Sequence, residues 1–166
     1  MVDPDIRARA ADLLTLARER GLTVATVESC TGGLVAGALT AIPGSSSVVL
    51  GGLVTYANAA KTALALVPAA LIDAHGAVSE PVARAMAEGG RARLASDLAV
   101  SITGVAGPDG GSQAKPVGLV HFACAGAGET RHRERRYGDK GRDEIRRLSV
   151  LEALDLLREA ALASVR

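Results

Sequence analysis

Aromatic residues are almost absent from this sequence, which has no tryptophan, two tyrosines and one phenylalanine among 166 residues. Proteins that bind single-stranded nucleic acid stack the bases on aromatic rings, so this scarcity argues against nucleic acid as a partner. The net charge of +1 gives no field that would attract nucleic acid or an anionic membrane. The hydrophobic residues, 48% of the chain, are mostly aliphatic, and they must form the core.

Cysteine and histidine are also scarce. The two cysteines, Cys30 and Cys124, form no C-x-x-C pair, and the three histidines lack the spacing of zinc ligands, so no disulfide framework and no metal site is predicted. The acidic N-terminal segment does not resemble a signal peptide, and no apolar run approaches the roughly 20 residues of a membrane span. We expect a soluble, cytoplasmic protein whose residues 1–166 form a single domain.

Helical and strand patterns alternate through the first two thirds of the chain. Helices are predicted at 3–21, after Gly33, at 58–66, at 68–74, from Ser79 onward and at 142–163. Strands are predicted at 22–28, 48–56 and 98–103, and an antiparallel pair at 117–125 and 129–137. This order predicts an α/β fold, a single-domain three-layer α/β/α sandwich with a mixed sheet.

The segment Glu28-Ser29-Cys30-Thr31-Gly32-Gly33 lies between a buried strand and a helix. Such a junction presents free backbone N–H groups, so a nucleophile and an anion site can share it. The alternative is that Ser29 or Thr31 simply caps the helix. Cys30 is a rival nucleophile, but neighbouring side chains of an extended strand point to opposite sides, so only one of Ser29 and Cys30 faces the site.

Lys61 is isolated among alanine, leucine and threonine, in a chain that has three lysines and otherwise uses arginine. A lysine held against apolar surface loses its proton more easily and can act as a base, whereas arginine cannot. Tyr56, five residues earlier, is placed to relay or orient a proton. The alternative is a lysine that extends from an ordinary helix into solvent.

Three polar or glycine-rich loops adjoin strand ends, at 28–33, 44–47 and 104–111. Ligands of α/β folds bind beyond the carboxyl ends of strands, so we expect these loops to converge. Each loop has a simpler explanation, either a solvated turn or a tight connection. Arg142 and Arg146, one helical turn apart, are placed to clamp a phosphate, or they lie on a solvated face.

Taken together, six motifs resemble the CinA carboxy-terminal domain family, which includes bacterial nicotinamide mononucleotide deamidases. They are Glu28-Ser29-Cys30-Thr31-Gly32-Gly33, Pro43-Gly44-Ser45-Ser46, Val54-Thr55-Tyr56-Ala57-Asn58-Ala59-Ala60-Lys61, His75-Gly76-Ala77-Val78-Ser79-Glu80, Thr103-Gly104-Val105-Ala106-Gly107-Pro108-Asp109-Gly110-Gly111 and Lys115-Pro116-Val117-Gly118. The resemblance covers nearly the whole chain. Before the last helix the family has Gly-Asp-Arg, and Arg142 is matched to that arginine although the spacing here differs.

The resemblance implies hydrolysis of the carboxamide of nicotinamide mononucleotide in pyridine nucleotide salvage, without metal or organic cofactor. It implies a stand-alone deamidase, a homodimer, with Ser29 as nucleophile, Lys61 and Tyr56 beside it and Thr103 in the site. The oxyanion is expected at the N–H groups near Thr31, Gly32 and Gly33. Phosphate and ribose are expected at Gly44, Ser45, Ser46, Gly104, Gly107 and Arg142. The alternatives are a non-catalytic nucleotide-binding or regulatory module and a serine amidase for another small substrate.

Overall fold

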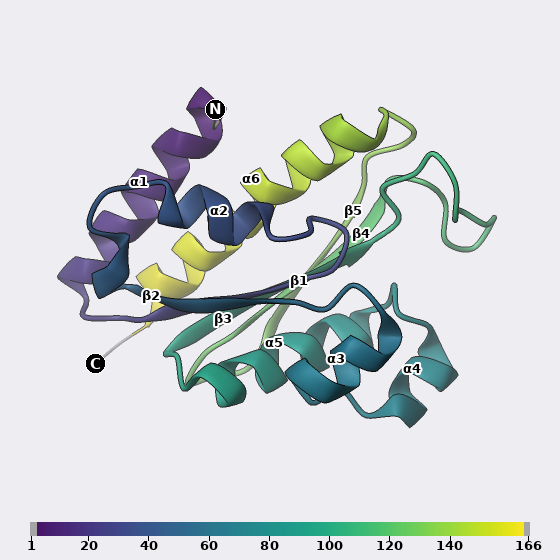
Figure 1. The fold of residues 1–166 in the computed structure, drawn as a ribbon, viewed down its shortest axis with the longest axis horizontal. Coiled ribbons are helices and arrows are strands. Elements are labelled where there is room, and N and C mark those ends of the chain that lie inside the picture. The colour runs from purple at the N-terminus through teal and green to yellow at the C-terminus, as the bar shows by residue number, and fades with distance from the viewer. Residues whose placement is uncertain (1–2, 165–166) are drawn as a thin grey trace.

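A five-stranded sheet lies between two layers of helices in the computed structural model, which describes residues 3–164 (Figure 1). The strands are β1 (Val24–Glu28), β2 (Val49–Val54), β3 (Leu98–Gly104), β4 (Leu119–Ala125) and β5 (Arg131–Arg136). The helices are α1 (Pro4–Glu19), α2 (Leu34–Thr40), α3 (Asn58–Ala65), α4 (Ala69–His75), α5 (Glu80–Leu94) and α6 (Arg142–Ala163), with a short 3₁₀ turn at Ser45–Ser47. The predicted α/β sandwich and its elements are confirmed.

The strand order is β2-β1-β3-β4-β5, and it contains both directions of pairing. Strand β1 is parallel to β2 and to β3, whereas β4 is antiparallel to β3 and β5 is antiparallel to β4. All five residues of β1 are buried, as expected for a strand in the parallel part of a sheet that helices cover on both faces. The carboxyl ends of β1, β2 and β3 therefore meet at one edge of the sheet.

The two helical layers cover opposite faces of the sheet (Figure 1). Helices α1, α2 and α6 pack on one face around a large aliphatic core, and α3, α4 and α5 cover the other. Side chains of β1 alternate between these faces, so that Val24 packs in the α1/α6 core and Val27 packs in the α5 core. Ser29, two residues after Val27, continues on the α3/α5 face.

Helix α5 approaches its neighbours closely because it carries two adjacent glycines. A Cβ atom at Gly89 would lie 1.7 Å from the carbonyl oxygen of Ala65, at the end of α3. A Cβ atom at Gly90 would lie 2.1 Å from a methyl group of Val27 in β1. A larger residue at Gly89 would push α3 away from α5, and one at Gly90 would push α5 away from β1. Together these glycines set how near α3 comes to the end of β1.

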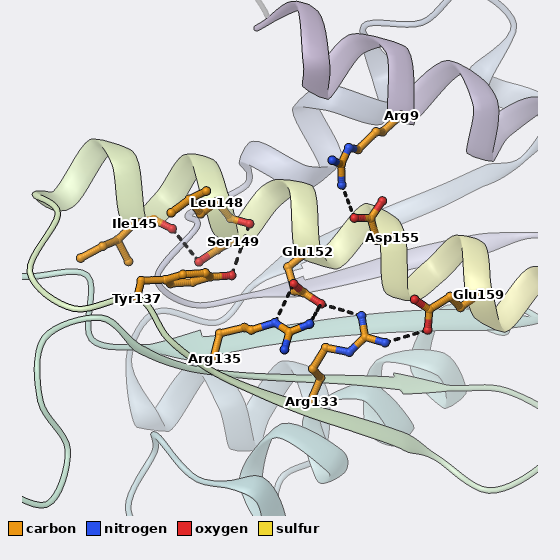
Figure 2. Close-up of polar contacts among 10 residues, drawn as sticks. All are labelled: Arg9, Arg133, Arg135, Tyr137, Ile145, Leu148, Ser149, Glu152, Asp155 and Glu159. Carbon is orange, nitrogen blue, oxygen red and sulfur yellow. Dashed lines mark hydrogen bonds and ion pairs between the residues drawn. The ribbon is translucent and has the colours of Figure 1, made fainter.

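Arginine–glutamate pairs fasten α6 to β5 (Figure 2). Arg133 and Arg135 of β5 both donate to Glu152 of α6, at 2.6 and 2.8 Å, and Arg133 also reaches Glu159. Burial raises the pKa of Glu152, but the two guanidinium groups outweigh burial, and the net pKa of this carboxyl is lowered. This network holds α6 along the sheet, with its N-terminal turns over the carboxyl end of β1 (Figure 1).

Candidate active site

Ser29 and Lys61 meet at the carboxyl end of β1. The Nζ atom of Lys61 lies 3.1 Å from the Oγ atom of Ser29. Ser29 directly follows β1, and its backbone N–H donates to the Ile102 carbonyl of β3, which anchors the serine to the sheet. Lys61 is the fourth residue of α3, so the helix delivers the amine to the serine from the α3/α5 face. The structure thus places the two residues in direct contact.

The surroundings of Lys61 favour its neutral form. The side chain is only 1% exposed, and burial lowers the pKa of its ammonium group. Nζ also lies 2.8 Å from the Thr55 carbonyl and 3.3 Å from the Tyr56 carbonyl. A neutral amine has two N–H donors and one lone pair. The two carbonyls take the two donors, which leaves the lone pair for the hydroxyl proton of Ser29.

Tyr56 contacts Lys61 through its backbone, and its hydroxyl has a different partner. The ring is 62% exposed, and its hydroxyl accepts a hydrogen bond from Nη2 of Arg142 at 3.2 Å. Nη1 of Arg142 donates to the Gly107 carbonyl at 2.9 Å. Since Lys61 touches Ser29 directly, no relay through the Tyr56 hydroxyl is needed. Tyr56, Arg142 and Gly107 instead form the rim of the site.

The N–H groups at the start of α2 are occupied by a carboxylate. Glu28 is completely buried, and its Oε2 atom accepts from the N–H of Gly33 and of Val35, at 3.0 and 3.1 Å. Its Oε1 atom accepts from the Ala36 N–H at 2.8 Å. The Gly32 N–H also has a partner, because it donates to the Ser29 carbonyl. The expectation that the N–H groups of Gly32 and Gly33 bind the oxyanion is therefore wrong. Neither Ser29 nor Thr31 caps this helix.

Cys30 lies on the opposite side of the chain from Ser29. It is buried in the core between the sheet, α1 and α6, as the alternation of an extended strand predicts. Burial raises the pKa of its thiol to about 12, which keeps the sulfur protonated. Its position and charge state both argue against a nucleophilic thiol.

The end of β3 forms the floor beside Ser29. Thr103 is buried, and its hydroxyl donates to the Ala77 carbonyl at 2.8 Å, which ties β3 to the segment before α5. Position 104 requires a glycine, because a Cβ atom there would lie 2.7 Å from a methyl group of Val120 in β4. Close packing therefore explains Gly104, whereas Gly107 supplies the carbonyl that orients Arg142.

The loop with Gly44, Ser45 and Ser46 lies at the other end of the sheet, so its expected convergence with the 28–33 segment is wrong within this chain. The loop precedes β2, and the Val48 carbonyl after it accepts from Val24, the first residue of β1. Strand β1 advances about 3.3 Å per residue, so roughly 15 Å separates this loop from Ser29. A loop that precedes a strand parallel to β1 must lie at the amino edge.

Two residues near Ser29 have roles that sequence reasoning missed. From the sequence, Glu28 is only part of a motif, whereas in the structure it is the carboxylate that accepts from the first N–H groups of α2. Arg146 of α6 was considered for a phosphate, but it donates to the chain itself, from Nε to the Cys30 carbonyl at 3.2 Å and from Nη2 to the Thr31 carbonyl at 3.3 Å. Such a contact depends on where α6 docks, which local sequence does not reveal.

Within residues 3–164, no three histidine, cysteine or acidic side chains are grouped so that they could hold a metal ion. In the same part of the chain, no helix is long and apolar enough to cross a membrane.

Comparison with known proteins places the chain among relatives of known fold. A profile of the CinA C-terminal domain matches residues 6–161. A CinA-like protein of Synechococcus sp. (strain RCC307) is 59% identical over 150 residues, which are 90% of this chain and 36% of that relative. A CinA-like protein of Gloeobacter violaceus is 57% identical over 94% of this chain and 36% of its own length. The chain thus spans about a third of these curated relatives.

Solved structures agree closely with the fold. The competence/damage inducible protein CihA from Agrobacterium tumefaciens is 48% identical, with a TM-score of 0.94 over 98% of both chains. A CinA superfamily protein from Escherichia coli is 31% identical, with a TM-score of 0.89 over 98% of this chain and 93% of that one. By sequence match over nearly its whole length and by fold, this chain belongs to the CinA C-terminal domain family.

Proposed function

We propose that this chain hydrolyses the carboxamide of nicotinamide mononucleotide to give nicotinic acid mononucleotide and ammonia. The observation that carries the proposal is the buried amine of Lys61, 3.1 Å from the hydroxyl of Ser29 and otherwise bonded to two neutral carbonyls. A serine hydroxyl is a weak nucleophile until a base removes its proton, and this amine is placed to do so. The choice of substrate follows from the motifs shared with nicotinamide mononucleotide deamidases.

In the proposed reaction, Lys61 takes the hydroxyl proton as the Ser29 oxygen attacks the carboxamide carbon. The tetrahedral intermediate carries its negative charge on the former carbonyl oxygen. When the carbon–nitrogen bond breaks, the protonated Lys61 returns its proton to the leaving nitrogen, and ammonia departs. Water then attacks the acyl-serine, Lys61 again accepts and returns a proton, and the carboxylate product leaves Ser29 free.

The rim of the site suits a nucleotide. Arg142 is exposed at the first turn of α6, and of the five N–H donors of its guanidinium the two that bond to Gly107 and Tyr56 leave three for a phosphate. Tyr56, whose carbonyl contacts Lys61, presents the one exposed aromatic ring among the described residues to a flat pyridinium ring. The substrate carries its own positive ring charge, so this part of the site needs no further cations.

The test is ammonia release from nicotinamide mononucleotide by the wild type, the Ser29→Ala variant and the Lys61→Arg variant. We expect the wild type to be active and both variants to lose at least about 100-fold in kcat, a loss worth roughly 2.7 kcal/mol. Because the neutral amine is the base, the wild-type rate should rise with pH, with an inflection below the ordinary lysine pKa of 10.5. A Ser29→Ala variant with more than a tenth of the wild-type rate would exclude this nucleophile.

A panel of substrates separates the remaining functions. Ammonia release is compared for nicotinamide mononucleotide, nicotinamide riboside and free nicotinamide. Preference for the mononucleotide supports the proposed substrate, whereas equal turnover of all three indicates a less selective amidase. Binding of the mononucleotide without ammonia release by the wild type would indicate a non-catalytic nucleotide-binding module.

A further inference from the structure

We propose that Arg146 is a positioning residue that aims the backbone N–H of Thr31 at the substrate's carbonyl oxygen. The inference rests on the proposed function in taking Ser29 as the nucleophile. Arg146 lies one turn into α6, is half-buried, and grips the turn after Ser29 by two successive carbonyls, those of Cys30 and Thr31, at 3.2 and 3.3 Å. Helix α3 lies on the other face of the sheet (Figure 1), and its Lys61 contacts Ser29 from there.

Because the peptide bond is planar and trans, the hydrogen bond from Arg146 to the Cys30 carbonyl also determines where the Thr31 N–H points. In a trans peptide unit the C=O and the N–H point in opposite directions. The unit that joins Cys30 to Thr31 directs its oxygen toward Arg146 on the α6 face. Its N–H, that of Thr31, is therefore directed away from α6, toward the face where Ser29 meets Lys61.

Two other N–H groups of the turn are already engaged, and a third is not held by Arg146. The Cys30 N–H shares its peptide unit with the Ser29 carbonyl, which accepts from Gly32 and not from Arg146. The Gly32 N–H donates to the Ser29 carbonyl, and the Gly33 N–H donates to Glu28. Among the described residues of this turn, only Thr31 has both an N–H without a hydrogen-bond partner and, in the same peptide unit, a carbonyl that Arg146 holds. A guanidinium on the carbonyl of the same peptide unit also polarises that N–H and strengthens it as a donor.

Such a donor works in the transition state, where the carbonyl oxygen becomes negative. Removal of one oxyanion donor costs about 10²–10³ in kcat in other enzymes. Loss of Arg146 leaves the Thr31 N–H in place but no longer fixes its direction. We therefore expect the Arg146→Met variant to lose about tenfold or more in kcat with little change in KM, and the Arg146→Lys variant to recover part of that loss, since one of two hydrogen bonds survives.

Arg147→Met is the matched control. Arg147 is the next residue of α6, but it pairs with Asp3, Asp5 and Glu144, away from Ser29. The urea midpoint, kcat, KM and the pH dependence of kcat are measured for each variant. The proposal is supported if only the Arg146 variants lose kcat while the pH inflection stays in place. It is overturned if KM for the mononucleotide rises at constant kcat, if the inflection moves, or if the unfolded fraction accounts for the loss.

A second readout needs no amide substrate. An alkyl fluorophosphonate reacts with an activated serine: the oxygen–phosphorus bond forms, the phosphorus–fluorine bond breaks, the hydroxyl proton goes to Lys61, and fluoride leaves. The phosphoryl oxygen then occupies the position of the oxyanion. Intact mass gives the labelling rate of Ser29, which should fall about tenfold in Arg146→Met and stay unchanged in Arg147→Met. Equal rates in these two variants reject the proposal. Labelling by a wild type that releases no ammonia rejects only the proposed substrate.

Discussion

The buried carboxylate of Glu28 makes a testable contribution to stability. It accepts three backbone N–H groups at the start of α2, at 3.0, 3.1 and 2.8 Å, and it sits where the helix dipole favours negative charge. Helix α2 has only seven residues, too few to form without such support. The substitution Glu28→Gln keeps the shape of the side chain but removes its charge and one of its acceptor oxygens.

The magnitude follows from the contacts. The amide oxygen of glutamine can retain the N–H groups of Gly33 and Val35, but its NH₂ group then faces the N–H of Ala36. One hydrogen bond to a charged acceptor is lost, at about 1.5–3 kcal/mol, and two others weaken to neutral strength. We expect the free energy of unfolding to fall by about 4 kcal/mol, a large share of the roughly 5–15 kcal/mol typical of a domain.

Urea unfolding followed by circular dichroism measures the effect. Glu129→Gln is the control, because Glu129 is exposed in the loop between β4 and β5. The midpoint should move far for Glu28→Gln and stay in place for Glu129→Gln, with similar slopes in urea. A loss below about 1 kcal/mol for Glu28→Gln would refute the assignment of this carboxylate as the cap of α2.

Two other predictions concern Cys30 and the histidine pair. The Cys30→Ala variant should keep at least about half of the wild-type kcat. Native Cys30 should resist iodoacetamide because burial raises the pKa of its thiol to about 12. Complete loss of ammonia release in Cys30→Ala would instead indicate that the thiol is the nucleophile. His121 and His132 lie 2.9 Å apart, and burial lowers the pKa of each below 6.5 despite Glu80 and Glu134 nearby. The unfolded chain therefore binds protons at higher pH than the fold, so stability should fall as the pH drops below about 6.5. His132→Gln should weaken this dependence in urea midpoints between pH 7.5 and 5.5, and an unchanged dependence would contradict it.

Much of the candidate site could be predicted because its signals are local. The scarcity of lysine indicates Lys61 as a candidate base, and strand alternation predicts that Ser29 and Cys30 face opposite sides of the sheet. The motifs around both residues indicated a family. The predicted convergence of Gly44, Ser45 and Ser46 with the 28–33 segment is wrong because composition indicates a loop but not the end of the sheet at which the loop lies.

The contacts around Ser29 depended on how separate elements dock. Composition suggested a hydroxyl as the cap of α2, but the tight turn brings the buried Glu28 carboxylate onto the helix amides and excludes Gly33 from the oxyanion role. The grip of Arg146 on the turn required α6 to lie across the end of β1, which the arginine–glutamate pairs of β5 and α6 help to fix. Neither arrangement has a signature in a short window of sequence.

The amino-acid sequence by itself determined the elements, their α/β class and the candidate pair of Ser29 and Lys61, because periodicity and motifs are properties of neighbouring residues. Only the tertiary structure decided that the amine touches the hydroxyl, and which backbone N–H remains for a substrate. Helix α3 carries Lys61 to β1 because α5 packs tightly against both through Gly89 and Gly90, a contact between segments far apart in the chain. A distance of 3.1 Å between two side chains is the outcome of that packing.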